Sequence, residues 1–344
     1  MKILFITPNP VFGGAATATI SVASLLRRRG IDVIYNDEYD KEKMRGNIVV
    51  DHYPYHAKKY SCHKEVRNHI CSIRPDVVVW SPQCSIYYYG DIKILQNIGI
   101  KQVCIIHSLS LKQNIIGKII DIFISKVIKQ LDATVFVSEF TLFSWEKYAS
   151  VKNCRGLKKV IYNAVETPQL IYERNIPLRV GFVGRFSAEK QPDLFCSMAD
   201  LFPNEYIFHA WGDGELLEAC KDMYPKIVFH GQENDINKIY KDIDILLLTS
   251  KFENCPMVIL EAKIRGIPCV APNVGGIPEI VKNEEDGVLY SSYEKDLIKA
   301  ALLKIINNYS SFSINCKNNS NAYSYAIVAD SWMDLFYRIE NDNK

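Results

Sequence analysis

Residues 2–35 have the sequence KILFITPNPVFGGAATATISVASLLRRRGIDVIY, and this stretch decides the fold class. The apolar runs at 2–7 and 31–35 each predict a buried strand. Between them, a glycine pair at 13–14 opens an amphipathic segment that predicts a helix over 15–29. A strand, a glycine turn, a helix and a second strand make one βαβ unit. The segment therefore predicts an α/β protein built on parallel sheets.

The βαβ pattern continues through the chain and restarts once. Uninterrupted apolar runs are typical of parallel strands buried on both faces, and they predict further strands at 76–80, 102–107, 133–138 and 159–165. After a linker-like stretch that begins at 168, a second series has strands at 178–184, 206–212, 226–231, 244–250 and 268–272. Residues 326–339 predict a final amphipathic helix. We therefore expect two doubly wound Rossmann-like domains, 1–170 and 171–325, facing a central cleft.

The composition fits a folded globular chain and excludes several classes of protein. Hydrophobic residues make up 48% and charged residues 23% of the 344 residues, which excludes a disordered or fibrous chain. The net charge of +2 argues against a protein that wraps nucleic acid. The ten cysteines include no C-x-x-C pair, so we expect buried, reduced thiols. With neither a signal peptide nor an apolar run of about 18 residues, the sequence indicates a cytoplasmic protein.

The segment KFENCPMVILEAKIRGIP, residues 251–268, combines two carboxylates with a predicted helix start. Glu253 lies in the loop after a predicted strand, and Glu261 lies in the helix that follows. Unpaired amides at a helix start favour a phosphate, and carboxylates accept hydrogen bonds from sugar or ribose hydroxyls. A nucleotide sugar offers both groups, so the predicted donor-binding residues are Glu253, Asn254, Cys255, Pro256, Met257, Val258 and Glu261. Each carboxylate alone also fits a solvated loop or a surface helix.

Other predicted strand ends carry groups suited to a phosphate. Arg185 and Lys190 follow a strand that ends in glycine, where they would neutralise a diphosphate; an ordinary surface pair is the alternative. Gly13 and Gly14 open a helix in the manner of a phosphate cradle. Their motif is neither G-x-G-x-x-G nor a P-loop, which disfavours an NAD or ATP site. Gly212 lies at a further strand end.

Three features allow two interpretations each. His107 ends a buried strand and fits a structural hydrogen bond as well as a catalytic role. The segment GGIPEIV at 275–281, with Glu279, fits a simple turn as well as a ligand contact. Residues 109–131 combine helical apolar spacing with an excess of lysine, which fits a core-packing helix as well as contact with an anionic membrane. The histidines of residues 40–70 lack metal-ligand spacing, so no metal site is predicted.

In their order and spacing, these motifs resemble the retaining glycosyltransferases of the GT-B fold, specifically family 4. ENCPMVILE at 253–261 is similar to that family's E-x7-E motif, and VGRFSAEK at 183–190 is similar to its G-R-x4-K element. WGDGE at 211–215, VIYNAV at 160–165, the N-terminal glycine pair and the strand-end histidine also fit. Asn-Cys replaces the commoner Gly-Phe after the first glutamate, so the resemblance implies no particular donor sugar.

The resemblance implies a role for each matched residue. It assigns the donor diphosphate to Arg185 and Lys190, with Gly14 approaching it from the first domain. The transferred sugar is assigned to Glu253 and His107, and the ribose to Glu261. It also implies that the first domain is the acceptor side and the second the donor side. The final helix, 326–340, would pack back on the first domain.

The implied activity is a front-face transfer that retains the anomeric configuration and needs no protein nucleophile, cofactor or metal. A UDP-sugar is the favoured donor and a GDP-sugar the other candidate. A glycan or polyprenyl-diphosphate-linked acceptor is expected, in O-antigen, capsule or lipopolysaccharide synthesis, at the inner face of the membrane. The alternatives are a nucleotide-sugar epimerase or phosphorylase on the same fold, and a non-catalytic nucleotide-sugar-binding subunit.

Overall fold

The computed structural model describes residues 1–6, 14–37, 52–54, 63–80, 89–110, 115–149, 151–168, 178–203 and 206–341. The chain divides into two compact units. The first unit comprises Met1–Ala164 and Tyr325–Lys344, and the second comprises Val165–Ser324. The sequence places the join near residue 170, and the structure places it at Ala164–Val165.

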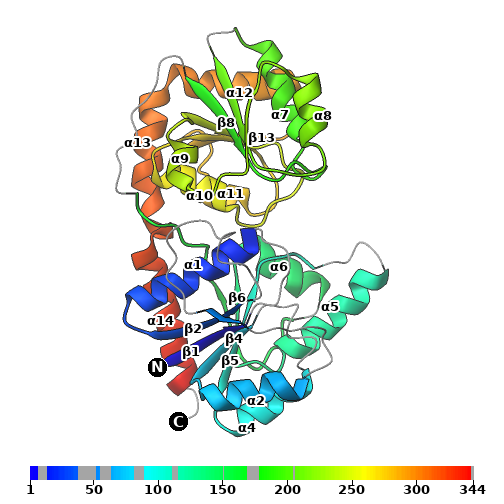
Figure 1. Ribbon diagram of the computed structural model, residues 1–344, viewed down its shortest axis with the longest axis vertical. Helices are drawn as coiled ribbons and strands as arrows, with labels where there is room; N and C mark the ends of the chain where they lie inside the picture. The colour runs from blue at the N-terminus through cyan, green and yellow to red at the C-terminus, as the bar shows by residue number, and fades with distance from the viewer. Residues whose placement is uncertain are drawn as a thin grey trace. The chain divides into compact units, whose positions relative to one another are not determined.

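The first unit is built on a parallel sheet of seven strands in the order β3-β2-β1-β4-β5-β6-β7 (Figure 1). Its inner strand β1 pairs in parallel with β2 on one side and with β4 on the other. The strands are β1 Lys2–Ile6, β2 Asp32–Asp37, β3 His52–Pro54, β4 Val77–Trp80, β5 Lys101–Ile106, β6 Ala133–Phe136 and β7 Leu157–Val160.

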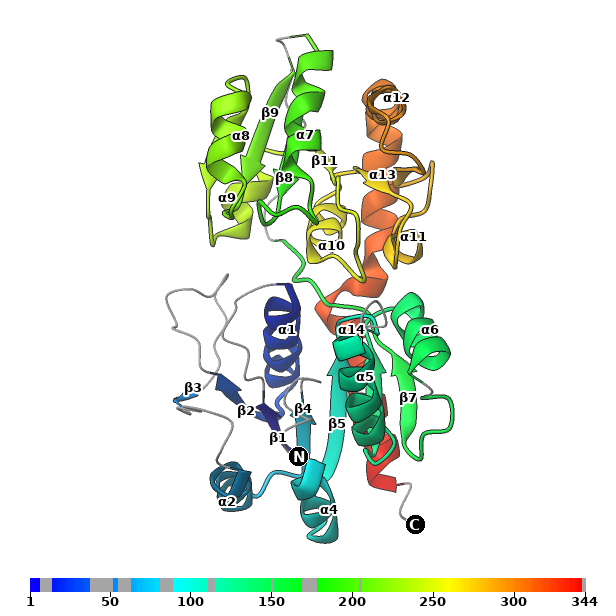
Figure 2. The same cartoon turned by 90° about the vertical axis from the view of Figure 1, so that its right-hand side faces the viewer.

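Helices cover both faces of this sheet, as a doubly wound fold requires. Side chains of α2, α4, α5 and α6 share one buried apolar cluster with alternate residues of the strands. Helices α1 and α14 contact each other (Figure 2). Two salt bridges hold α14 in place. Arg29, which follows α1, lies 2.8 Å from Asp330, and Lys159 of β7 lies 2.6 Å from Asp334. The helices are α1 Gly14–Arg28, α2 His63–Ile73, α4 Tyr89–Asn97, α5 Ile115–Ile128, α6 Glu139–Tyr148 and α14 Tyr325–Asn341.

The second unit repeats the plan with six parallel strands in the order β10-β9-β8-β11-β12-β13. Its core contains phenylalanine rings that pack at tilted angles: the centre of the Phe195 ring lies 5.3 Å from that of Phe182 and 5.8 Å from that of Phe208. The strands are β8 Arg179–Val183, β9 Ile207–Trp211, β10 Val228–Gly231, β11 Ile245–Leu247, β12 Cys269–Pro272 and β13 Gly287–Tyr290. The helices are α7 Pro192–Met198, α8 Leu217–Met223, α9 Ile236–Tyr240, α10 Met257–Ile264, α11 Ile277–Ile280, α12 Lys295–Asn307 and α13 Tyr309–Ser320, with short 3-10 turns η2 Ala199–Leu201 and η3 Asn321–Tyr323.

The chain passes between the units twice, and the two passages are hydrogen-bonded within the second unit. Val165, the first residue of that unit, donates its N–H to the carbonyl oxygen of Tyr323 at 2.9 Å. Val165 also forms a parallel bridge with Ser324, the last residue of the unit. The entry and exit segments of the second unit are therefore held together.

The prediction of two doubly wound parallel sheets is confirmed, with differences at the edges. The predicted strand at 159–165 ends at Val160, because the chain then leaves the sheet toward the second unit. Strands β3 and β13 were not predicted. Both are short edge strands, and β3 consists of His, Tyr and Pro, which give neither an apolar run nor an alternating pattern.

Candidate functional site

The loops that follow β8 and β11 lie at the carboxyl edge of the second sheet, where ligands bind in open α/β folds. Side-chain and backbone bonds join these two loops. The hydroxyl of Thr249 lies 2.8 Å from the carbonyl oxygen of Lys190 and 2.9 Å from that of Gln191. The N–H of Lys251 donates to the carbonyl oxygen of Glu189 at 2.8 Å. The two predicted motifs, 183–190 and 253–261, are therefore fixed against each other.

Lys190 and Glu253 form an ion pair at this edge. The Lys190 ammonium lies 2.6 Å from Oε1 of Glu253, and the Ser250 hydroxyl donates to the same oxygen at 2.9 Å. The side chains are 24% and 11% exposed, so the pair is partly shielded but reachable. Both bonds use Oε1, which leaves Oε2 to accept from a ligand hydroxyl. The structure thus places a cation suited to phosphate beside a carboxylate suited to a sugar.

The start of α11 holds the backbone of Glu253. The N–H of Gly276 donates to the Glu253 carbonyl oxygen at 3.1 Å. Gly275 has a φ of +60°, and a Cβ atom on it would lie 1.8 Å from that oxygen. Only glycine fits there. The segment 275–281 therefore supports the candidate site by holding the backbone of Glu253.

Gly212 has a comparable backbone role after β9. Its φ is +134°, and a Cβ atom would lie 1.8 Å from the carbonyl oxygen of Gly184. The Gly184 N–H in turn donates to the Trp211 carbonyl oxygen at 3.0 Å. Arg185, the next residue, is exposed. The close contact at Gly212 thus fixes the loop that presents Arg185 to solvent.

Helix α10 starts one residue later than the sequence suggests. Pro256 is its N-cap residue and makes no side-chain capping bond, so the helix begins at Met257. Cys255 and Met257 are buried, while Asn254 and Val258 are partly exposed. A helix start without a side-chain cap keeps the amide groups that favour an anion.

Glu261 is buried, so the interpretation as a surface helix residue is wrong. The Tyr240 hydroxyl donates to Oε2 of Glu261 at 2.8 Å, and Arg265 donates to the Glu261 carbonyl oxygen at 2.8 Å. Tyr240 belongs to α9 and lies in no recognisable motif, so sequence reasoning missed it. Thr249 also lies outside the recognised motifs, so it was missed for the same reason.

In the first unit, His107 directly follows β5 and contacts α1. Its Nε2 lies 2.9 Å from the Thr19 hydroxyl, which donates its proton to the Ala15 carbonyl oxygen at 2.9 Å. In the tautomer that carries its proton on Nε2, His107 donates to the Thr19 oxygen. Burial lowers the pKa of His107 to about 4, so the imidazole is neutral at pH 7. Gly14 is the first residue of α1, and Gly13 lies outside the described residues.

The segment 109–131 contributes to the core, as one of its two interpretations requires, and it also has exposed apolar side chains. In α5, Ile124, Val127 and Ile128 pack in the core of the first unit, and Ile122 and Phe123 are exposed. No helix in the described part of the chain is long and apolar enough to cross a bilayer. Within the same residues, no three His, Cys, Asp or Glu side chains gather as a metal-ligand set.

Comparison with known families matches both halves of the chain. The family model for glycosyl transferases group 1 matches residues 177–308, and the model for glycosyltransferase family 4 matches residues 12–169. Together they cover both units, including the candidate site in the second.

Two curated relatives are similar to parts of this chain. The UDP-Gal:alpha-D-GlcNAc-diphosphoundecaprenol alpha-1,3-galactosyltransferase of Escherichia coli is 32% identical over 170 residues, which cover 45% of this chain and 44% of that protein. The lipopolysaccharide 1,6-galactosyltransferase of Salmonella typhimurium is 32% identical over 149 residues, which cover 38% and 41%. The match thus spans less than half the length of either relative.

A solved structure matches nearly the whole chain. Anabaena HepE, crystallised in complex with UDP, superposes with a TM-score of 0.79 at 17% identity, covering 98% of this chain and 100% of that one. At this identity the likeness shows the fold, and it confirms the predicted GT-B fold.

The lowered pKa of His107 predicts a pH-dependent contribution to stability. The unfolded histidine titrates near pH 6.5, so the unfolded chain takes up a proton before the folded one does. The free energy of unfolding therefore falls as the pH drops from 6.5 toward 4, by at most about 1.4 kcal/mol per pH unit for this group. We expect His107→Gln, which keeps a donor for Thr19, to show a shallower fall.

Urea unfolding of both proteins at pH 7, 6 and 5 measures this difference. His209, whose pKa burial lowers to about 4, remains in both proteins, so its contribution cancels. If the free energy of unfolding falls equally with pH in the two proteins, the lowered pKa of His107 is contradicted.

Proposed function

Because the chain belongs to the GT-B glycosyltransferases whose two halves the family 4 and group 1 models describe, we propose that it transfers a sugar from a nucleotide-sugar donor to a glycan or lipid-linked acceptor. The proposed process is the synthesis of a bacterial surface polysaccharide. This proposal rests on the ion pair between Lys190 and Glu253 at the carboxyl edge of the second sheet. One loop supplies a cation for phosphate and the other a carboxylate for a sugar hydroxyl.

The site residues divide the donor between them. Lys190 has two ammonium protons left beyond its bond to Glu253, and these, with the exposed Arg185, would bind the diphosphate. Oε2 of Glu253 would accept from a hydroxyl of the transferred sugar. Glu261 would bind the ribose through Oε1, since Tyr240 occupies Oε2. His107, neutral at pH 7, would contact the donor sugar as a hydrogen-bonding group.

The proposed chemistry retains the anomeric configuration. The bond between the sugar and the diphosphate breaks through an oxocarbenium-like transition state, and the acceptor oxygen attacks from the same face. The departing phosphate accepts the acceptor proton, so the protein contributes positioning and charge stabilisation. Arg185 and Lys190 would stabilise the negative charge on the departing diphosphate, and no metal or cofactor is proposed.

A UDP-sugar is the proposed donor, ahead of a GDP-sugar. The Escherichia coli relative is named for UDP-Gal and for an acceptor linked to diphosphoundecaprenol. That name supports a polyprenyl-diphosphate-linked acceptor here as well. An epimerase, a phosphorylase and a non-catalytic subunit are less favoured, because both family models describe transferases and the charged motif residues are present.

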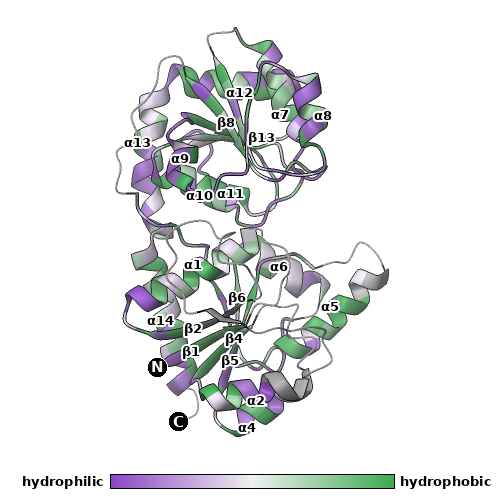
Figure 3. Ribbon diagram, in the orientation of Figure 1, coloured by the Kyte–Doolittle hydropathy of each residue, from purple (hydrophilic) through white to green (hydrophobic). Residues whose placement is uncertain are grey.

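We also propose that α5 and α6 contact the membrane that carries such an acceptor. Exposed Phe123 lies under Lys126 at 5.5 Å, and exposed Phe143 lies under Lys147 at 5.3 Å. Figure 3 shows α5 coloured as hydrophobic over much of its length. Aromatic rings beside lysines suit the interface of an anionic lipid surface, where the ring enters the headgroup region and the cation pairs with phosphate.

Removing either partner of the ion pair should strongly slow sugar transfer without unfolding the protein. We expect Lys190→Ala and Glu253→Ala each to lower the rate of sugar transfer by about 10²–10³-fold, the usual cost of losing one charge-stabilising group. A partly exposed pair contributes about 1 kcal/mol or less to stability, so the melting temperature should change by a few degrees at most. Lys251→Ala, in the same loop, is the matched control. Wild-type rates in either variant would contradict the proposal.

A thermal-shift screen should identify the donor. Saturating UDP-sugars should raise the melting temperature more than GDP- or ADP-sugars, because a ligand at about 100 times its Kd stabilises by roughly 2.7 kcal/mol. The same screen with EDTA tests metal independence, since the shift should persist. A larger shift with a GDP-sugar would overturn the choice of nucleotide.

The membrane contact should depend on the two aromatic rings. We expect Phe123→Ser with Phe143→Ser to reduce binding to phosphatidylglycerol-containing vesicles at least fivefold in a flotation assay, by removing about 1.5–3 kcal/mol of apolar burial per ring. Tyr337→Ser, on α14, removes a ring that is 69% exposed and should have no effect. Equal binding to phosphatidylcholine vesicles, or unchanged binding of the double variant, would contradict this surface.

A further inference from the structure

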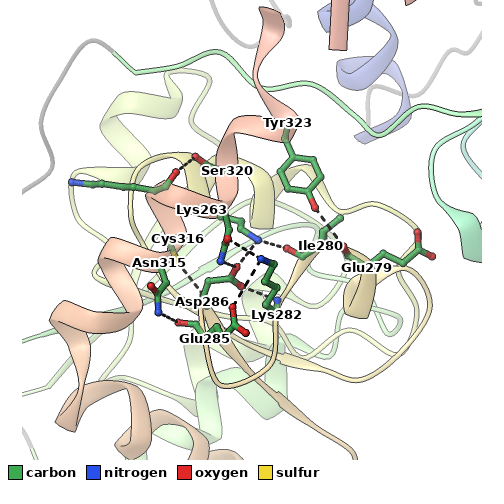
Figure 4. Close-up of polar contacts among 12 residues, drawn as sticks. Lys263, Glu279, Ile280, Lys282, Glu285, Asp286, Asn315, Cys316, Ser320 and Tyr323 are labelled. Carbon is green, nitrogen blue, oxygen red and sulfur yellow. Dashed lines mark hydrogen bonds and ion pairs between the residues drawn. The ribbon is translucent and has the colours of Figure 1, made fainter. Parts of the chain in front are cut away.

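Lys263 is a buried cation at the far end of the helix that follows Glu253 (Figure 4). It lies on α10 and is 4% exposed, and its partner Asp286 is 2% exposed. The ammonium lies 2.8 Å from Oδ2 of Asp286 and donates to the carbonyl oxygen of Ile280 at 2.6 Å. Ile280 is the last residue of α11. The ammonium therefore joins the second half of α10 to the end of α11.

The same two helices are joined at their other ends through Glu253. As described above, Gly276 at the start of α11 donates to the carbonyl oxygen of Glu253, just before α10. The Gly276–Glu253 hydrogen bond thus joins the two helices at their start, and the Lys263–Ile280 hydrogen bond joins them at their end. Together these two bonds fix the angle between the helices, whereas the Gly276 bond alone would let α10 rotate about Glu253.

Asp286 connects this helix pair to α13. Its Oδ1 accepts from the Lys282 N–H at 2.9 Å, and its Oδ2 also accepts from the side-chain amide of Asn319 at 2.9 Å. The Cys316 thiol donates to the Asp286 carbonyl oxygen at 3.0 Å. Asn319 and Cys316 are both on α13. The carboxylate is therefore held in place from two directions, and it orients the Lys263 ammonium.

Tyr323 brings the exit segment of the second unit into contact with the same group. The Lys263 ammonium lies 5.5 Å from the centre of the Tyr323 ring. The Tyr323 hydroxyl donates to the Glu279 carbonyl oxygen on α11 at 3.4 Å. Its carbonyl oxygen accepts from Val165, where the chain enters the unit. The segments through which the chain enters and leaves the second unit, at Val165 and Tyr323, are thus connected to the ends of α10 and α11.

We propose that Lys263 is a positioning residue for the donor site, which it serves by fixing α10 against α11 and so placing Glu253 and the start of α10. This inference rests on the proposed function, because the site it positions is the donor site. This role depends on the directional hydrogen bonds that the Lys263 ammonium donates. An apolar side chain of similar length could fill the same space, but it could not bond Ile280 and Asp286 at once.

Stability alone does not account for a buried charge at this position. Replacing a buried ion pair by uncharged residues of similar volume is often neutral or stabilising, whereas removing one partner leaves an unpaired charge. A neutral double replacement therefore separates positioning from stability. In Lys263→Met/Asp286→Asn, the asparagine oxygen still accepts from Lys282, and no buried charge remains alone.

Two measurements on this double variant test the proposal. We expect its Kd for UDP, measured by titration calorimetry, to rise at least tenfold while its melting temperature stays within a few degrees of wild type. We also expect the Gly276 amide to exchange its hydrogen at least tenfold faster, because the tie at Glu253 loosens. If the double variant does not fold, Asn319→Ala weakens the hold on Asp286 and should raise both quantities about threefold.

The matched control is a largely buried ion pair at the opposite edge of the same sheet. Arg179, the first residue of β8, lies 3.1 Å from Asp244 through Nε. Arg179→Met/Asp244→Asn should leave the Kd for UDP and the Gly276 exchange rate within twofold of wild type. Unchanged UDP affinity and exchange in the Lys263 variant, or equal changes in the control, would overturn the proposal. If the wild-type chain binds no UDP, the proposed function fails, and the exchange rate still decides whether Lys263 fixes the helix pair.

Discussion

Close contact between backbones at the carboxyl edge of the second sheet is the constraint on which the candidate site depends. Gly212 allows the loops after β8 and β9 to touch, and Gly275 allows the start of α11 to reach the carbonyl oxygen of Glu253. With no Cβ at these points, the loops after four different strands, β8, β9, β11 and β12, come into contact in pairs. The Lys190–Glu253 ion pair forms because the backbones beneath it are already fixed. Side-chain chemistry at this edge is thus a consequence of backbone packing.

The sequence predicts the parts of this arrangement that depend on local patterns. Apolar runs locate most strands, because a strand buried on both faces needs an apolar side chain at nearly every position. The motifs locate Lys190 and Glu253, because each follows such a strand. Contacts across long separations leave no local pattern, so Tyr240 beside Glu261 was not predicted. Edge strand β3 was missed because its residues, His-Tyr-Pro, form neither an apolar run nor an alternating pattern.

Helix α10 shows why charge patterns alone mislead. Its segment EAKIR contains Glu261, Lys263 and Arg265, which suggest a solvated face, yet all three side chains are buried. Each has a partner outside its own turn: Tyr240 for Glu261, Asp286 for Lys263, and Asn237 for Arg265 at 3.1 Å. Buried charges persist only where such partners satisfy them. The near-zero net charge of the chain gives no sign of this arrangement.

The groups that hold α10 and its preceding loop lie on three different elements, and this distribution explains how one short helix can be held in a single orientation. Tyr240 holds α10 from α9, Asp286 holds it from the loop before β13, and Gly276 holds the residue that precedes it from α11. A hydrophobic contact would tolerate rotation of the helix by part of a turn, because dispersion forces are not directional. Hydrogen bonds to three fixed points do not tolerate such a rotation, because they are directional. The proposed donor site, which would place a carboxylate and helix amides around one diphosphate sugar, needs this kind of restraint, since a displacement of about 1 Å is costly for catalysis.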